Sequence, residues 1–412
     1  MGVTLLKIKF DGRAVAIAFL VAYFCALASM YAFDVPRPWR FLGVNQASPP
    51  FIDLDNVLTA VDCHRLGLDT LVLNPCDSLG RPLDYPRVWL ALGALGASHA
   101  WLVPAGIALG LAVLGTVLAC LGRLSIGGGI VAGAALLSPS FMYLIERGNI
   151  DEIILVLVAA SAVLAASTVR TSRWIAVAIV AFAAILKLYP VAASVATLAP
   201  RGKLPAYRRW SGVAFTVGLF AAYLAATWRD LLLIVRLVPA SVGESYGAGV
   251  LSGGLGDALQ FQAVPRPVTL GIGLAVISCG SILGLVSAAR GVAPPSWTAN
   301  ARGRLFAAGA AIYVATFCLG HNYAYRLAFV LLTIPALLEW GTAKNLGGLA
   351  SRALLGVTLA VLYLAPLGPI LLPPVFYLWV LGQVAGWLLA FGFAWCLAAG
   401  AELVGSPAAT GD

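Results

Sequence analysis

Long apolar stretches recur along the chain, and short segments between them carry most of its charges. A bilayer core of about 30 Å needs roughly 20 apolar residues per helix, so such stretches predict membrane-spanning helices. We expect them at residues 14–33, 101–121, 124–144, 151–169, 174–200, 210–228, 267–289, 304–320, 326–341, 353–368 and 375–400. The pattern therefore predicts an all-α, polytopic membrane protein with a single transmembrane domain over residues 1–412.

The stretch 174–200 differs from the others because Lys187-Leu188-Tyr189-Pro190 interrupts it and basic residues flank it at both ends, Arg201 and Lys203 among them. Proline breaks a helix and disfavours helix in the residue before it. We therefore expect two short helices that meet at an outward-facing apex. Counting both gives about 11–12 crossings and places both termini on the same, cytoplasmic side.

Composition and charge agree with this topology. Apolar residues make up 61% of the chain and charged residues 10%, whereas soluble domains average about 45–50% and 25%. Basic residues concentrate in cytoplasmic loops. Our alternation gives the inner segments a net charge of +11 and the rest of the chain −2, which together make the formal net charge of +9. The run 14–33 follows basic residues as a signal peptide does, but no small-x-small motif ends it, so we interpret it as the first span.

Two segments on the outer side are long. The first, residues 34–100, predicts short helices at 56–66 and 88–97 that would suit the membrane surface. It also contains Cys63 and Cys76, which would share an oxidising compartment, so we expect a disulfide between them in preference to two free thiols. The second, residues 229–267, is glycine-rich and typical of a mobile cover.

The acidic pair Asp53 and Asp55, in Pro-Phe-Ile-Asp-Leu-Asp-Asn, is the first candidate for chemistry. In a partly desolvated site one carboxylate would have its pKa raised and could act as a general base. Alternatively, Asp55 caps a helix that begins near Asn56.

Charged and polar residues also interrupt the apolar sequence elsewhere. Glu146, Arg147, Asn149 and Asp151 lie between two apolar runs, and a charge at the bilayer centre costs at least about 2.5–3.5 kcal/mol. These four residues must therefore face water, a partner or a cavity, unless they form an ordinary external turn.

Isolated basic residues at the outer edge could bind a lipid phosphate, for which Arg offers two parallel bonds and Lys a point charge. The candidates are Arg87, Lys187, His321 and Arg326. We see no spaced set of metal ligands, no nucleotide-binding glycine loop and no Gly-x-Ser-x-Gly motif. We therefore expect neither a metal nor a cofactor.

Several short motifs occur in a recognisable order, and together they resemble glycosyltransferase family 87 over roughly residues 14–340. They are Asp53-Leu54, Gly67-x-Asp69, Tyr85-Pro86, Gly148-Asn149 and Lys187-Leu188-Tyr189-Pro190. Members of this family are polyprenol-phosphate-mannose-dependent mannosyltransferases of the GT-C superfamily. The chain departs from the family pattern at Arg87, where a second proline is commoner, and in the segment from Asn74 to Asp77.

The resemblance implies that Asp53 is the general base for an inverting transfer of mannose from a polyprenyl-phosphate donor to a glycolipid or glycan acceptor. Lys187, with Arg326 or His321, would stabilise the leaving phosphate. It also implies the bacterial inner membrane as the location, with the active site on the periplasmic side.

Two other functional classes remain as alternatives for the chain. One is a transporter or flippase of a lipid-linked sugar, and the other is a structural membrane subunit. Two similar halves with charges at mid-membrane depth would favour the transporter.

Overall fold

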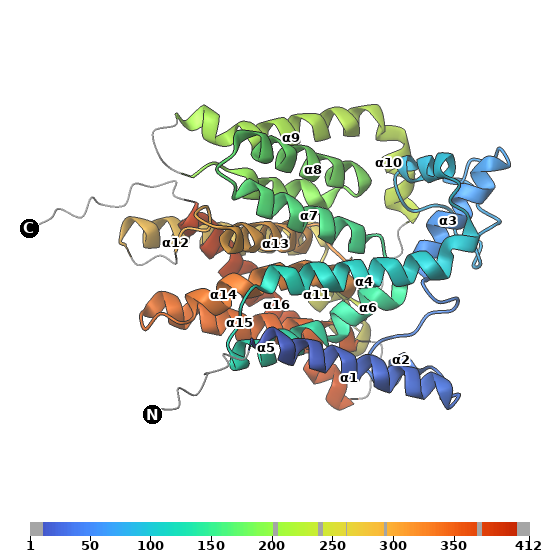
Figure 1. Ribbon diagram of the computed structural model, residues 1–412, viewed down its shortest axis with the longest axis horizontal. Coiled ribbons are helices and arrows are strands. Elements are labelled where there is room, and N and C mark those ends of the chain that lie inside the picture. Colours follow the sequence, from blue (N-terminus) through green and yellow to red (C-terminus); the bar gives the residue numbers. More distant parts are fainter. Residues whose placement is uncertain are drawn as a thin grey trace, which may run out of the picture.

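The computed structural model describes residues 11–200, 205–237, 242–260, 262–291, 295–368 and 373–401. Arg201 and Lys203, which we expected to flank a span, lie outside these ranges, as do residues 238–241 and 261 of the second external segment. Helices dominate, and most run side by side along the long axis of the molecule (Figure 1).

Within these described ranges, six helices are long and apolar enough to cross a membrane. They lie within α1 (Arg13–Ala32), η2 with α4 (His99–Trp101 and Leu102–Leu121), α9 (Ala206–Ala226), α12 (Arg266–Ala289), α15 with η5 (Leu346–Leu364 and Ala365–Leu367) and α16 (Pro373–Gly400). The protein is therefore an all-α, multi-pass membrane protein. The sequence had suggested 11–12 crossings, and the difference arises because several apolar stretches form shorter, broken elements.

One broken element is the predicted span 124–144. It consists of α5 (Ile126–Leu136) and α6 (Pro139–Arg147), whose axes differ by 49°. The break falls before Pro139, which has no N–H to continue the helix. The hydroxyl of Ser138 caps the new helix by accepting a hydrogen bond from the Phe141 N–H at 3.4 Å. A bent pair of this kind can count as one span, which would be the seventh.

Short helices form most of the interior. They are α7 (Asp151–Ala165), η3 (Tyr189–Thr197), α13 (Ala301–Cys318), η4 (Ala324–Thr333) and α14 (Ile334–Trp340). The helix α8 (Arg170–Leu186) buries one face and exposes the other. The helix α13 packs against α7, η3 and η4, and most of its residues are buried. After Lys187 the chain turns back so that η3 packs on α8, which gives the predicted hairpin a 3₁₀-helical second arm. Short elements are tolerated at membrane depth where protein surrounds them.

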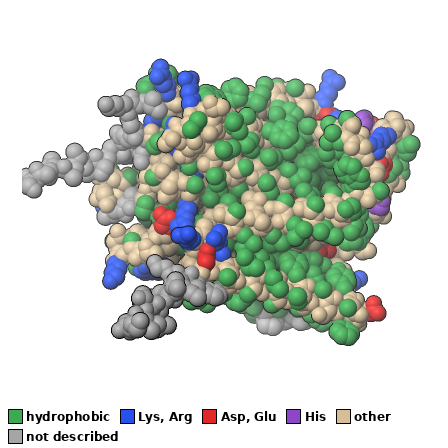
Figure 2. Space-filling view, viewed as in Figure 1, with side chains coloured by type: hydrophobic (Ala, Val, Ile, Leu, Met, Phe, Trp, Pro, Cys, Tyr) green, Lys and Arg blue, Asp and Glu red, His purple; other side chains and the backbone are tan. Residues whose placement is uncertain are grey.

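The peripheral helices present apolar side chains outward. In the apolar stretch of α9 only 11% of the residues are buried, and in the apolar stretches of α1 and α12 only 17% are. Figure 2 shows hydrophobic side chains over the middle of one face, with charged side chains gathered toward its two ends. This distribution is the one that a bilayer requires.

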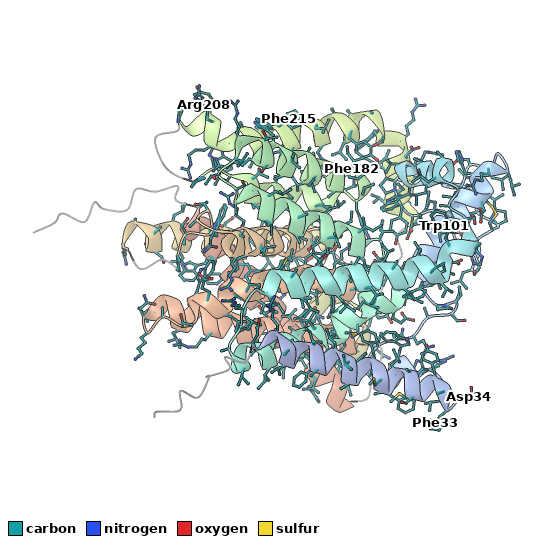
Figure 3. All side chains as sticks on the ribbon, viewed as in Figure 1. Phe33, Asp34, Trp101, Phe182, Arg208 and Phe215 are labelled. Carbon is teal, nitrogen blue, oxygen red and sulfur yellow. A yellow bond between two sulfur atoms is a disulfide. The ribbon has the colours of Figure 1, made fainter. Side chains whose placement is uncertain are left out.

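The first and second external segments contain α2 (Pro38–Phe41), α3 (Ile52–Arg65), η1 (Arg87–Leu95), α10 (Trp228–Leu237), β1 (Ser245–Tyr246) and α11 (Val250–Leu259). Of these, α3 and α10 lie at one end of the molecule (Figure 1). The strand β1 pairs antiparallel with β2 (Asn322–Tyr323). Asp34 and Trp101 lie at this end and Arg208 at the opposite end (Figure 3).

In the first external segment, Cys63 and Cys76 are joined by a disulfide bond that closes a loop between residues 13 apart in sequence. We expect replacement of both cysteines by serine to destabilise the protein by about 3 kcal/mol, because the bond restricts the unfolded chain. Thermal unfolding in detergent, compared with that of the variant Cys120→Ser, would measure this loss. Equal unfolding temperatures for the double variant and the parent would contradict it.

Candidate active site

The helix α3 carries the first candidate residue, Asp53. The helix starts at Ile52, directly after Phe51, whose φ of 56° turns the chain in the left-handed region. Asp53 therefore lies in the first turn, where the positive end of the helix dipole favours a carboxylate. Its side chain is partly exposed and lines a cavity of about 330 Å³.

Asp55 does not share this cavity. Successive helical residues are about 100° apart, so Asp53 and Asp55 project in different directions. The Asp55 side chain is fully buried, 3.1 Å from Nε2 of His99 and 3.4 Å from the Ser78 N–H. The expectation of a paired carboxylate site is therefore wrong. Capping by Asp55 is wrong as well, because the helix begins four residues before Asn56.

Asn149 links the carboxylate of Asp53 to the ammonium of Lys187. Its Nδ2 donates to Oδ2 of Asp53 at 2.6 Å, and its Oδ1 accepts from Nζ of Lys187 at 3.1 Å. The preceding Gly148 ends α6 with a φ of 56°, a conformation that glycine adopts without strain. The turn thus aims a fully buried amide at two charged groups at once.

Two basic side chains share one buried carboxylate behind this amide. Nζ of Lys187 lies 2.5 Å from Oδ1 of Asp151, and Nε of Arg326 lies 3.6 Å from Oδ2. Arg326 also donates through Nη1 to Oδ1 of Asn322 at 2.6 Å, which ties it to β2. Asp151 holds both cations in place, but its single charge leaves one positive charge in excess.

Basic side chains also outnumber acidic ones on the cavity wall. The lining residues are Asp53, Arg81, Pro82, Asp84, Tyr85, Tyr143, Arg147, Lys187, Leu237, Tyr323, Tyr325 and Arg326. Four of them are basic and two acidic. The ammonium of Lys187 lies over the rings of Tyr85 and Tyr325, at 5.1 and 5.7 Å from their centroids. A cavity of this composition suits an anion, with aromatic faces beside it.

Two of the charged lining residues, Arg81 and Asp84, were not predicted as site residues. Arg81 is held by Asp77 at 2.8 Å and donates to the carbonyl oxygen of Ile52, also at 2.8 Å. Burial, and then the negative charge of Asp53, raises the pKa of Asp84 to about 6. Burial likewise raises the pKa of Tyr85 well above its usual value, so its hydroxyl stays protonated. In the sequence, the only signal for Asp84 as a site residue was the Tyr85-Pro86 motif that directly follows it.

The raised pKa of Asp84 predicts a pH dependence of stability. Its carboxyl is protonated more readily in the folded than in the unfolded protein, so this group's stabilisation is full below about pH 4 and is lost as the pH rises through about 6. We expect Asp84→Asn to raise the unfolding temperature relative to the parent at pH 7.5 but to change it little at pH 4. Differential scanning fluorimetry in detergent would test this, with Asp257→Asn as the control. An equal effect at both pH values would contradict it.

Three other predicted residues lie away from the cavity. Arg87 pairs with Asp69 at 2.8 Å and with Asp230 at 2.9 Å, and so ties the first external segment to α10. His321 is exposed next to β2 and does not line the cavity. Glu146 lines a neighbouring cavity instead.

No three His, Cys, Asp or Glu side chains within the described ranges are arranged to hold a metal ion.

When the chain was compared with protein-family models, with curated proteins and with solved structures, no match was found.

Proposed function

We propose that this protein is a membrane glycosyltransferase of the GT-C type, related to glycosyltransferase family 87. It would transfer a sugar, most simply mannose, from a polyprenyl-phosphate donor to an acceptor hydroxyl at the periplasmic face of the bacterial inner membrane. The observation that carries the proposal is the cavity in which the partly exposed carboxylate of Asp53 faces four basic side chains. A base and a phosphate site next to each other are what this transfer needs.

In the proposed reaction, the Asp53 carboxylate takes the proton from the acceptor hydroxyl. The acceptor oxygen then forms a bond to the anomeric carbon, and the bond from that carbon to the phosphate oxygen breaks. The electron pair leaves with polyprenyl phosphate, and the anomeric centre is inverted. Since the lipid carrier activates the sugar, the reaction needs no nucleotide.

Asn149 would position both partners of this reaction. Its Nδ2 occupies one oxygen of Asp53, which leaves the other oxygen to accept the proton. Its Oδ1 keeps Lys187 turned toward the same cavity. Holding the base and the cation at a fixed distance lowers the activation barrier, because neither group has to reorganise during the reaction.

Lys187, Arg326 and Arg147 would stabilise the charge that develops on the leaving phosphate. The Arg147 guanidinium donates to the hydroxyl of Tyr143 at 2.7 Å, which leaves other N–H groups for a ligand. Arg147 thereby takes the role that the family resemblance offered to His321.

The deciding experiment incubates the purified protein, in native lipid extract, with labelled polyprenyl-phosphate-mannose. Transfer predicts a labelled glycolipid or glycan and the release of polyprenyl phosphate. A flippase would instead move the intact donor between leaflets, which a vesicle assay of donor accessibility detects. Movement of intact donor without any transferred label would overturn the proposal.

A further inference from the structure

A second cavity, of about 790 Å³, adjoins the first and differs from it in chemistry. Its volume falls in the range of about 300–1,000 Å³ that small-molecule sites occupy. Its lining residues are Tyr31, Arg37, Trp39, Arg40, Asn45, Gln46, Ala47, Ser48, Pro50, Phe51 and Glu146. Most belong to the end of α1 and the segment that leads into α3.

Glu146 brings a buried carboxylate to this cavity. One of its oxygens accepts a hydrogen bond from the Ala47 N–H at 2.6 Å. The other, Oε2, is buried without a hydrogen-bond partner within the described ranges, and Nε of Arg147 lies 3.6 Å from it. The Oε1 atom of Gln46 is a second buried acceptor with no such partner. Buried acceptors are costly unless a donor reaches them, so the cavity is suited to a ligand that donates hydrogen bonds.

In two pairs of residues that are close in sequence, one member lines the first cavity and the other lines the second. Arg147 lines the first cavity and Glu146 the second, because consecutive helical residues project about 100° apart. In the same way Asp53 lines the first and Phe51 the second. The end of α6 and the start of α3 therefore form a wall that both cavities share. A ligand in the second cavity would lie beside the base.

We infer that the second cavity binds the hydroxyl-rich sugar of the acceptor, an inference that rests on the proposed function. Hydroxyl groups would donate to Glu146 Oε2 and Gln46 Oε1, and the rings of Tyr31, Trp39 and Phe51 offer apolar faces to the sugar. The phosphate of the donor is a diester without an O–H group, so it cannot donate to these acceptors. The phosphate of the donor thus belongs in the first cavity and the acceptor sugar in the second.

The inference predicts a selective kinetic effect of Glu146→Gln. The amide keeps the shape, but its single oxygen is needed to accept from the Ala47 N–H, so an NH2 group replaces the acceptor Oε2. We therefore expect the KM for an alkyl hexoside acceptor to rise about tenfold. The KM for the polyprenyl-phosphate donor is expected to stay unchanged. Glu152→Gln is the matched control, because Glu152 is also a buried glutamate without a hydrogen-bond partner in the described chain but lies in neither cavity. An unchanged acceptor KM in Glu146→Gln would overturn the inference.

A binding measurement separates this inference from the proposed function. An alkyl hexoside bearing a diazirine is photo-crosslinked to the full chain, and the labelled peptides are mapped by mass spectrometry. We expect label within residues 31–51 or 139–147, displaced by an unlabelled alkyl hexoside and reduced about tenfold in Glu146→Gln. Should Glu146→Gln fold poorly, Glu146→Asp, which keeps the carboxyl group on a shorter side chain, is expected to give intermediate labelling. Label confined to other segments would overturn the inference, whereas correct labelling without any transfer would contradict only the proposed function.

Discussion

Replacement of Asp53 by Asn is expected to lower sugar transfer by about 10²–10⁴-fold, the usual contribution of a general base. The amide has the shape of the carboxylate but cannot take the proton of the acceptor hydroxyl. Folding should survive, because the new side-chain oxygen can still accept the hydrogen bond from Nδ2 of Asn149. The measurement is the rate of label transfer from polyprenyl-phosphate-mannose, normalised to folded protein.

The matched control is Asp55→Asn. Asp55 lies on the same turn of α3 but is buried beside His99 and outside the cavity. We therefore expect this variant to lose some stability and to keep its transfer rate per folded molecule. Full activity in Asp53→Asn would exclude Asp53 as the base, and loss of transfer in Asp55→Asn alone would move the chemistry to the other side of the helix.

The sequence predicted the peripheral part of the fold better than its interior. The apolar stretches that became α1, α9 and α12 are long because these helices face the surroundings over their full length. Inner segments such as 326–341 became η4 and α14 instead, since buried helices can be short and bent when neighbouring helices shield their backbone. Hydropathy does not distinguish these two situations.

The candidate site was predicted in part, and the successes have a common physical reason. Lys187, Asn149 and Asp151 stood out because charged or polar groups in apolar sequence need partners, and in the structure they are partners of one another. Asp55 was misjudged because the start of α3 decides which way its side chain points. Arg81 and Asp84 lie in an irregular segment, which sequence periodicity does not place.

The charge of Lys187 gives the second large prediction, because it serves both the fold and the proposed chemistry. Lys187→Met removes the nearest cation from the buried Asp151 carboxylate, at 2.5 Å, so we expect a loss of about 3–5 kcal/mol in the free energy of unfolding. Arg326 remains 3.6 Å from Asp151 and should keep the loss near the lower value. Transfer is expected to fall by about 10²–10³-fold, since a positive charge at the developing phosphate is lost.

A double variant separates the two roles of Lys187. Lys187→Met combined with Asp151→Asn removes the unpaired buried carboxylate, so we expect most of the lost stability to return while transfer stays low. Lys187→Arg, which keeps the charge at a changed position, is expected to retain more activity than Lys187→Met. Chemical denaturation and the label-transfer assay, applied to all three variants, give both quantities. If the double variant transferred sugar at the parental rate, Lys187 would be a partner of Asp151 alone, and the phosphate site would rest on Arg326 and Arg147.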